Sequence, residues 1–276
     1  MERRITASDY PGITSANAEQ RGIHGNGNTI IMTIERIMGS VDHGLTRTGR
    51  EEAMRIGITL ALKGGLTAMF TSPQKRAVET ARIVASYQKG SWRRGDMEGG
   101  DMEVRITEGL APWYLGQFEG QPEEEAEPFA KWLMLHPDYT PAGKNPESTQ
   151  LPESFESFKN RLLEFVRSMS GRMSEKRRIG LVTHSRDVQI IRAWDKAGRK
   201  GTDLDMEMCC DESGSGLVPV WLMTKSSLKP LDLKTDQDEG AGLYIVRHGP
   251  TDWDAQDNKA PAMASLERRL KSVRVR

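Results

Sequence analysis

The sequence predicts an α/β fold, a three-layer sandwich in which helices cover both faces of a central, mostly parallel sheet. Two observations lead to this prediction. Short apolar runs typical of buried strands alternate with longer segments whose apolar residues recur at helical spacing. The chain has 276 residues, of which 37% are hydrophobic, which is enough for one domain core. We expect this domain to span about 31–258, between a flexible arm over 1–30 and a basic tail over 259–276.

The first predicted helix begins at a capping box. Thr48 and Glu51 have the spacing at which two side chains satisfy free backbone groups, and helical apolar spacing continues to about residue 63. An apolar strand is expected over 66–70. After it, Ser72 can cap a second helix, with Pro73 at the first helical position.

The later elements follow from the same two patterns. Residues 86–103 are rich in glycine and mixed charge and predict a surface excursion. Pro219 favours an edge strand or a bulge for the apolar run 217–223, because proline cannot donate to a central ladder. The remaining predictions are a short helix over 129–135 ended by Pro137, a loop over 141–152, a helix through 158–169, a strand over 179–182, a helix over 186–197 closed by Gly198, a polar connector over 225–240 and a buried central strand over 243–246.

Composition and charge exclude several classes of protein. The net charge is zero, so nothing favours a nucleic acid or an anionic membrane as a partner. No apolar run approaches the roughly 18 residues of a membrane span, and the first residues lack the apolar core of a secretory signal. Cys209 and Cys210 are adjacent, which suits neither a disulfide framework nor a metal site. We therefore expect a cytoplasmic protein.

Arg247, His248 and Gly249 directly follow the expected central strand. Arginine is a permanent cation whose planar fork of donors suits phosphate, and histidine can be a neutral nucleophile near pH 7. Glycine lets the backbone approach a ligand closely. Because ligands of open α/β sheets bind outside the carboxyl ends of the strands, this position predicts a phosphate site.

Two further tracts supply groups that can hold an anion. The tract TSPQKRAVETA places Arg76 in the first turn of a helix that follows a strand, where free backbone donors favour an anion. His184 follows an apolar strand in the same way as His248 does. Two histidines that each end an apolar strand favour one shared site over two unrelated core residues.

These tracts resemble the histidine phosphatases, the phosphoglycerate mutase-like superfamily. The resemblance implies the phosphoglycerate mutase-like fold and a site in which His248 takes up the phosphoryl group while Arg247, Arg76 and His184 hold its oxygens. It implies no metal and no cofactor. The neighbouring residues that would contact the substrate are Gly249, Thr251, Trp253 and Ser185.

The proton donor for the leaving group is left open by the sequence. Residues 108–120, EGLAPWYLGQFEG, resemble the family segment in which a glutamate is the acid, but this chain has Pro112 at that position. Glu119 and Glu108 are the nearest carboxylates and are the two candidates. A missing general acid typically costs about 10² to 10⁴ in rate, so good leaving groups would be favoured.

The tracts come in an unusual order. In the family, the strand that ends in Arg-His-Gly (RHG) comes first, whereas here its counterpart at 247–249 follows every other tract. We interpret this as a circular permutation in which 225–240 joins what are the two chain ends in the rest of the family. A short repeat, 33–42 against 265–274, supports the interpretation. One alternative is that His24 and the following glycine are a degenerate first RHG. Another is that the last strand completes a neighbouring chain, which would make the protein a homodimer.

We expect a phosphatase of the histidine acid phosphatase type that hydrolyses phosphomonoesters of small metabolites through a phosphohistidine on His248. Its expected partner is therefore a small phosphorylated substrate. Phosphoglycerate mutase-type transfer at the same site is one alternative. The other is a catalytically weakened module that binds a phosphorylated ligand or partner, which Pro112 favours, as does Asp254 where the family often has asparagine.

Overall fold

The computed structural model describes the central part of the chain. The described residues are 37–88, 102–121, 123–144, 146, 148, 150–173, 177–204, 209, 220–234 and 239–249. The predicted arm over 1–30 and the predicted tail over 259–276 lie outside them, as do His24 and most of the predicted excursion over 86–103.

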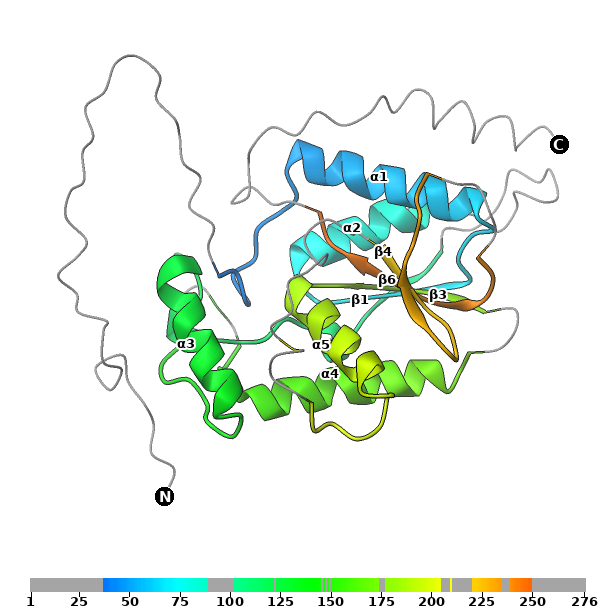
Figure 1. Ribbon diagram of the computed structural model, residues 1–276. Helices are drawn as coiled ribbons and strands as arrows, with labels where there is room; N and C mark the ends of the chain where they lie inside the picture. The colour runs from blue at the N-terminus through cyan, green and yellow to red at the C-terminus, as the bar shows by residue number, and fades with distance from the viewer. Residues whose placement is uncertain are drawn as a thin grey trace, which may run out of the picture.

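A six-stranded sheet forms the centre of the molecule (Figure 1). Its strands, in spatial order, are β2 (Val104–Ile106), β1 (Ala68–Thr71), β3 (Arg178–Thr183), β6 (Gly242–Arg247), β4 (Val220–Met223) and β5 (Leu228–Pro230). The first four are parallel to one another, and β4 runs antiparallel to both β6 and β5. The predicted mostly parallel sheet is confirmed, and the carboxyl ends of β1, β3 and β6 meet at one edge.

Helices cover both faces of this sheet. The first face carries α1 (Arg47–Leu62) and α2 (Lys75–Ser86), and the second carries α4 (Phe155–Ser170) and α5 (Ser185–Lys196) (Figure 1). β6 contributes to both apolar cores, because side chains alternate along a strand. Tyr244 and Val246 pack with α1 and α2, whereas Leu243 and Ile245 pack with α4 and α5. Burial on both faces explains why this strand reads as a continuous apolar run.

A third helix lies beyond the end of the sheet. Two short 3₁₀ helices follow β2, η2 (Glu108–Leu110) and η3 (Gly116–Phe118), and α3 (Glu123–Leu135) packs on η3. Phe129 of α3 stacks on Phe118, with ring centroids 3.8 Å apart. The helix begins six residues before the predicted 129–135, because its polar first turns carry no apolar periodicity that would mark them as helical.

The other helices match their predicted ranges within a few residues. The starts of α1 and α2 are the exceptions. Thr46, and not Thr48, caps α1, and its side chain accepts from the backbone N–H of Gly49. The predicted cap of α2 also differs. Ser72 is not the N-cap, because the helix starts at Lys75 with Gln74 in the capping position. The backbone N–H of Lys75 donates to Asp42 Oδ1 at 2.6 Å, so a carboxylate from a distant segment serves the first turn. At the other predicted cap, Gly198 follows the end of α5 with a φ of 74°, as a C-terminal glycine should.

The structure differs from two predictions here, an edge strand over 217–223 and a connector without a strand over 225–240. β4 lies between β6 and β5, so it is not an edge strand. Pro219, on which that prediction rested, lies outside the described residues. The edge strand on this side of the sheet is β5, which forms inside the predicted connector 225–240 and carries Pro230, where no central ladder bond is lost.

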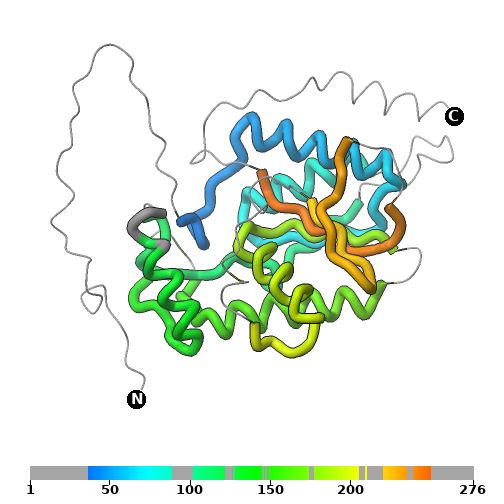
Figure 2. Tube along the Cα trace, in the orientation of Figure 1, coloured from blue at the N-terminus to red at the C-terminus, as the bar shows by residue number. Residues whose placement is uncertain are grey.

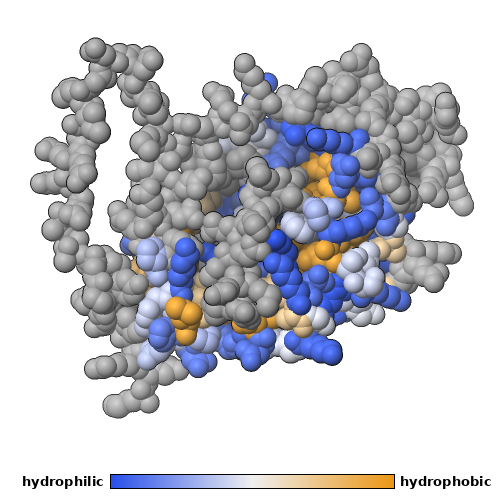
Figure 3. Space-filling view, viewed as in Figure 1, coloured by the Kyte–Doolittle hydropathy of each residue, from blue (hydrophilic) through white to orange (hydrophobic). Residues whose placement is uncertain are grey.

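Polar residues cover most of the described surface on the face seen in Figure 3, and apolar residues form small separate patches there. Within the described segments, no helix combines the length and the apolarity that crossing a membrane requires.

Candidate active site

Two neighbouring parallel strands bring His184 and His248 together. Thr183 of β3 pairs with Arg247 of β6, so the next residue of each strand leaves the sheet at the same place. The backbone N–H of His248 donates to Thr183 O at 3.2 Å. The ring centroids of the two histidines are 5.0 Å apart, with their planes at 66°. Figure 2 shows these strands side by side in the middle of the fold, although they are far apart in the chain.

Arg76 links the two rings. The side chain is almost fully buried, with Nε donating to His248 Nε2 at 3.3 Å and Nη2 lying 3.4 Å from His184 Nδ1. Its other contacts are with the loop before α1, where Nη1 donates to Val41 O at 2.9 Å and Nη2 to Gly39 O at 2.8 Å. A permanent positive charge is therefore held between the histidines by backbone carbonyls.

His248 has the protonation state of a nucleophile. Its Nδ1 lies 2.8 Å from Gly249 O, so Nδ1 carries the hydrogen and Nε2 keeps its lone pair. The contact with the Arg76 donor fits this tautomer. Burial by neighbouring atoms, and then the charge of Arg76, lower the pKa of His248 to about 3, although the residue stays partly exposed to solvent. The imidazole is neutral near pH 7.

His184 is a neutral, buried donor. Because arginine can only donate, His184 Nδ1 is an acceptor toward Arg76, and Nε2 carries the hydrogen. Nε2 lies 2.7 Å from the hydroxyl oxygen of Ser72. Burial, and then the charge of Arg76, hold the pKa of His184 well below its ordinary value. Both histidines are thus uncharged beside two arginines, which leaves the site positively charged.

Arg247 has a donor that fits an external oxygen. Its Nε is buried and has no hydrogen-bond partner within the described part of the chain. The nearby carboxyl group of Glu52, on α1, was not among the sequence candidates. Burial raises the pKa of Glu52, and the charge of Arg247 opposes that shift. A buried guanidinium donor without a partner is the kind of group that an anion satisfies.

Gly249 packs against α1. A Cβ at this position would lie 2.8 Å from the Cα of Gly49, so the two glycines allow the end of β6 to approach the helix. Ser185 begins α5 directly after His184. The predicted substrate contacts of Gly249 and Ser185 remain predictions, and Thr251 and Trp253 lie outside the described residues.

Glu119 lies in a buried hydrogen-bond network. Oε1 accepts from the backbone N–H of Leu115 at 2.8 Å, and Oε2 accepts from the hydroxyl of Ser40. Burial raises the pKa of Glu119, although these hydrogen bonds oppose the shift. The carboxyl group fills the space where a Cβ on Gly39 would be, in the turn whose carbonyl accepts from Arg76. This position suits support of the turn better than proton transfer to a substrate.

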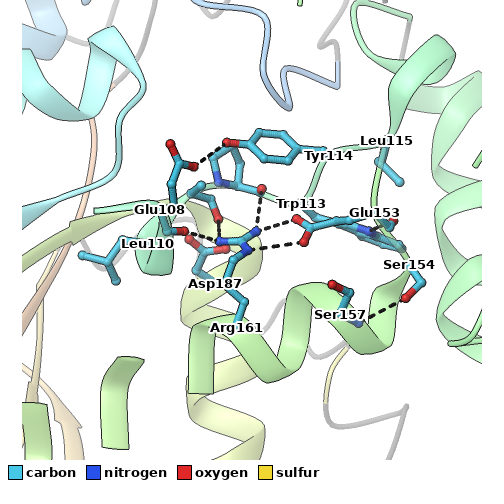
Figure 4. Close-up of polar contacts among 12 residues, drawn as sticks. Glu108, Leu110, Trp113, Tyr114, Leu115, Glu153, Ser154, Ser157, Arg161 and Asp187 are labelled. Atoms are coloured by element: carbon cyan, nitrogen blue, oxygen red, sulfur yellow. Dashed lines mark hydrogen bonds and ion pairs between the residues drawn. The ribbon is translucent and has the colours of Figure 1, made fainter. Parts of the chain in front are cut away.

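Glu108 is at the carboxyl edge of the sheet and is exposed. The backbone N–H of Thr107 donates to Thr71 O at 2.9 Å, so η2 begins where β1 ends. Glu108 Oε2 accepts from the hydroxyl of Tyr114 at 3.2 Å, and the polar ends of the two side chains meet in Figure 4. Of the two predicted acids, Glu108 is exposed to solvent and Glu119 is buried.

Arg161 holds the segment that carries Glu108 (Figure 4). From α4, it donates to the backbone carbonyls of Glu108, Ala111 and Pro112, and it forms an ion pair with Glu153. No local sequence pattern indicates this role, because the carbonyl partners of Arg161 lie some fifty positions earlier in the chain. The carbonyl of Pro112, the residue at the position of the family glutamate, is therefore fixed by this guanidinium.

Comparisons with known proteins agree with this fold. The family model of the histidine phosphatase superfamily, branch 1, matches residues 24–201, a range that contains Arg76 and His184 and ends before β6. Phosphoglycerate mutase-like protein 4 of Arabidopsis thaliana is 26% identical over 163 residues. The alignment covers 58% of this chain and 63% of that protein, less than two thirds of its length.

Solved structures with a similar arrangement include YhfR of Bacillus stearothermophilus, with 24% identity and a TM-score of 0.47 over 80% of this chain and 90% of that one. Another is a putative alpha-ribazole-5'-P phosphatase of Escherichia coli, with 18% identity and a TM-score of 0.46 over 73% of this chain and 89% of that one. Since the family model matches more than half of the sequence, this chain belongs to the histidine phosphatase superfamily.

Proposed function

We propose that this protein is a phosphatase that hydrolyses phosphomonoesters of small metabolites through a phosphohistidine on His248. The observation that carries the proposal is the position of a neutral His248 Nε2 at 3.3 Å from the Arg76 guanidinium and beside His184. A lone pair next to fixed cationic donors is what nucleophilic attack on a phosphate requires.

In the first step, the Nε2 lone pair of His248 attacks phosphorus and the bond from phosphorus to the leaving oxygen breaks. Arg76 and Arg247 stabilise the negative charge on the other three oxygens, and His184 joins them by turning its Nε2 hydrogen from Ser72 to a phosphate oxygen. The His248 ring keeps its Nδ1 hydrogen, which Gly249 O accepts throughout. In the second step, water attacks phosphorus and the bond between phosphorus and nitrogen breaks, which releases phosphate and restores the neutral ring.

We assign proton transfer to Glu108. Its carboxyl group would protonate the leaving oxygen in the first step and take a proton from water in the second. Its exposure at the carboxyl edge of the sheet and the placement of its segment by Arg161 support this role. Glu119 is proposed instead to support the turn that holds Arg76, because its carboxyl group is buried in hydrogen bonds to that region.

We infer that the chain is circularly permuted within the family. The last described strand, β6, lies between β3 and β4 at the centre of the sheet, and the family match ends before it. In this chain β6 pairs with its own β3, so one subunit can supply both histidines.

The test is hydrolysis of an activated aryl phosphate, with EDTA present, by the wild type and by His248→Ala. We expect a loss on the order of 10⁴-fold or more, since removing a nucleophile usually costs at least this much. His136→Ala is the matched control, because His136 stacks on Trp132 of α3 away from the site and should leave the rate unchanged. Equal rates for the wild type and His248→Ala would refute the assignment, whereas acid-labile phosphate on wild-type His248 would support it.

Pro112 favours a second candidate, a module that binds a phosphorylated ligand without efficient turnover. In that case the wild type would hydrolyse neither aryl nor alkyl phosphates. It would still bind inorganic phosphate, and Arg247→Ala would abolish this binding. Phosphate binding without any turnover is thus the result that would select this candidate.

A further inference from the structure

Asp187 is a buried carboxyl group that the proposed chemistry does not use. It lies in the first turn of α5, just after His184, and its side chain has no solvent exposure. Oδ2 accepts from the hydroxyl of Thr183, and the backbone N–H of His184 also donates to the carboxyl group. Oδ1 is buried and has no hydrogen-bond partner among the described residues. An ionised carboxylate with an unpartnered oxygen is costly in such a place.

The hydroxyl of Thr183 lies between two acceptors. The oxygen that donates to Asp187 also lies 3.3 Å from the carbonyl oxygen of Leu110, in η2. A hydroxyl has one hydrogen, so it satisfies one acceptor at a time. If the Asp187 carboxyl group is protonated, it can donate to the Thr183 oxygen, and the Thr183 hydrogen is then free for Leu110. The same atoms therefore support two hydrogen-bond arrangements.

The charges around Asp187 bring the two arrangements close in free energy near neutral pH. Burial raises the pKa of Asp187 to about 7, against the lowering effects of the Thr183 hydrogen bond and of Arg161 on α4. Glu153, just before α4, adds a smaller raising effect. The histidines at the ends of β3 and β6 have lowered pKa values and are uncharged in this range.

We propose that Asp187 is a positioning residue whose carboxyl group selects the acceptor of the Thr183 hydroxyl and thereby couples the His184 end of β3 to the 108–112 segment. With the carboxyl group protonated, Thr183 holds Leu110 and so fixes η2, including Glu108, against β3. With the carboxyl group ionised, Thr183 turns to Asp187, η2 loses this bond, and a negative charge lies close to the proposed phosphate site. Both changes lower activity, so activity falls as the pH rises through the pKa of Asp187.

The direct test is NMR spectroscopy of the full-length protein with ¹³C-labelled carbonyl and carboxyl carbons, from about pH 5 to about pH 9. In the wild type, the carboxyl carbon of Asp187 and the carbonyl carbon of Leu110 should titrate with one midpoint. In Asp187→Asn the Leu110 signal should not titrate. In Thr183→Val the carboxyl group should still titrate while the Leu110 signal stays constant, and Thr183→Ser should behave like the wild type. A Leu110 signal that is constant in the wild type, or that titrates in Thr183→Val, would overturn the proposal.

The kinetic readout rests on the proposed function. For aryl phosphate hydrolysis, kcat of the wild type should fall by about tenfold across this transition, the equivalent of one net hydrogen bond. Asp187→Asn mimics the neutral carboxyl group and should lack the decline, apart from the ionisation of the substrate, which all variants share. A decline in Thr183→Val equal to that of the wild type would overturn the coupling, because charge alone would then explain it. If the wild type has no activity, the proposed function fails, and the NMR titration still decides the role of Asp187.

Discussion

The two sides of the candidate site are held in different ways. On one side, His184 and His248 leave adjacent parallel strands, and the ladder between β3 and β6 fixes their separation. On the other side, Glu108 lies on a segment with little regular structure, and one guanidinium, that of Arg161, holds three carbonyls of that segment. Many backbone bonds tolerate the loss of any one side chain. The segment that carries Glu108 relies more on side-chain hydrogen bonds, chiefly those of Arg161 and also that of Thr183, so proton transfer should be easier to damage than the nucleophile.

Asp187 lies where the two sides meet, and its ionisation should have the largest effect on stability. Its pKa in the folded protein is about 7, above the ordinary value of 3.8. Between these two pH values, the folded protein keeps the proton on Asp187 and the unfolded chain loses it. This contribution to stability is fully present below about pH 4 and is lost as the pH rises through about 7. At 1.36 kcal/mol per pKa unit, the loss is about 4 kcal/mol.

Urea denaturation of the wild type and of Asp187→Asn over this pH range measures the effect. The free energy of unfolding of the wild type, relative to the variant, should fall by that amount. The two histidines contribute with the opposite sign, but they are present in both proteins and cancel in the difference. A difference that does not change with pH would show that Asp187 is not protonated in the folded state.

Replacing Arg161 tests whether one side chain holds the second side of the site. Arg161→Ala should lower the free energy of unfolding by about 3 kcal/mol, because Glu153 and three carbonyls lose their partner together. Arg167→Ala, a change on the same helix at an exposed position, should cost less than about 1 kcal/mol. If Arg161→Ala also prevented phosphohistidine formation from an aryl phosphate, the histidine side would depend on Arg161 as well, and the proposed difference between the two sides of the site would be wrong.

Glu108→Gln separates proton transfer from nucleophilic attack. We expect kcat for an alkyl phosphate to fall by about 10²-fold, whereas kcat for an aryl phosphate, whose leaving group needs little protonation, should change by less than about threefold. Glu119→Gln should instead lower stability, since its carboxyl group is buried in the network with Ser40. Equal losses on both substrates in Glu108→Gln would remove Glu108 from the proton-transfer role.

Gly249→Ala tests the packing that supports the nucleophile. The new Cβ would lie 2.8 Å from Gly49 Cα and 2.9 Å from Gly49 O, so β6 or α1 must move, at a cost of about 2 kcal/mol in unfolding free energy. Gly44→Ala is a suitable control, because its Cβ would meet nothing closer than 3.5 Å. Unchanged stability and activity in Gly249→Ala would mean that the strand end is not tightly packed on the helix.

Local sequence patterns predicted the strands, the helices and the residues that directly follow the strands. His184 and His248 could be paired from sequence because each directly follows an apolar run, and the ends of parallel strands share an edge. The edge strand was placed wrongly because the prediction rested on Pro219 alone, whereas β5 is a strand of three residues without an apolar run. Glu52, Arg161 and Asp187 carry no local signal, because burial and charge from distant segments determine their properties.

The central position of β6 has a consequence for how the protein is made. β3 and β4 are synthesised before the strand that separates them, so their facing edges have no partner until residues 242–247 have left the ribosome. When β6 pairs with β3 and β4, His248 is placed at the carboxyl end of the completed sheet. Nascent chains that end before this point would therefore lack both the completed core and the nucleophile, so activity would appear only in molecules that have closed their central sheet.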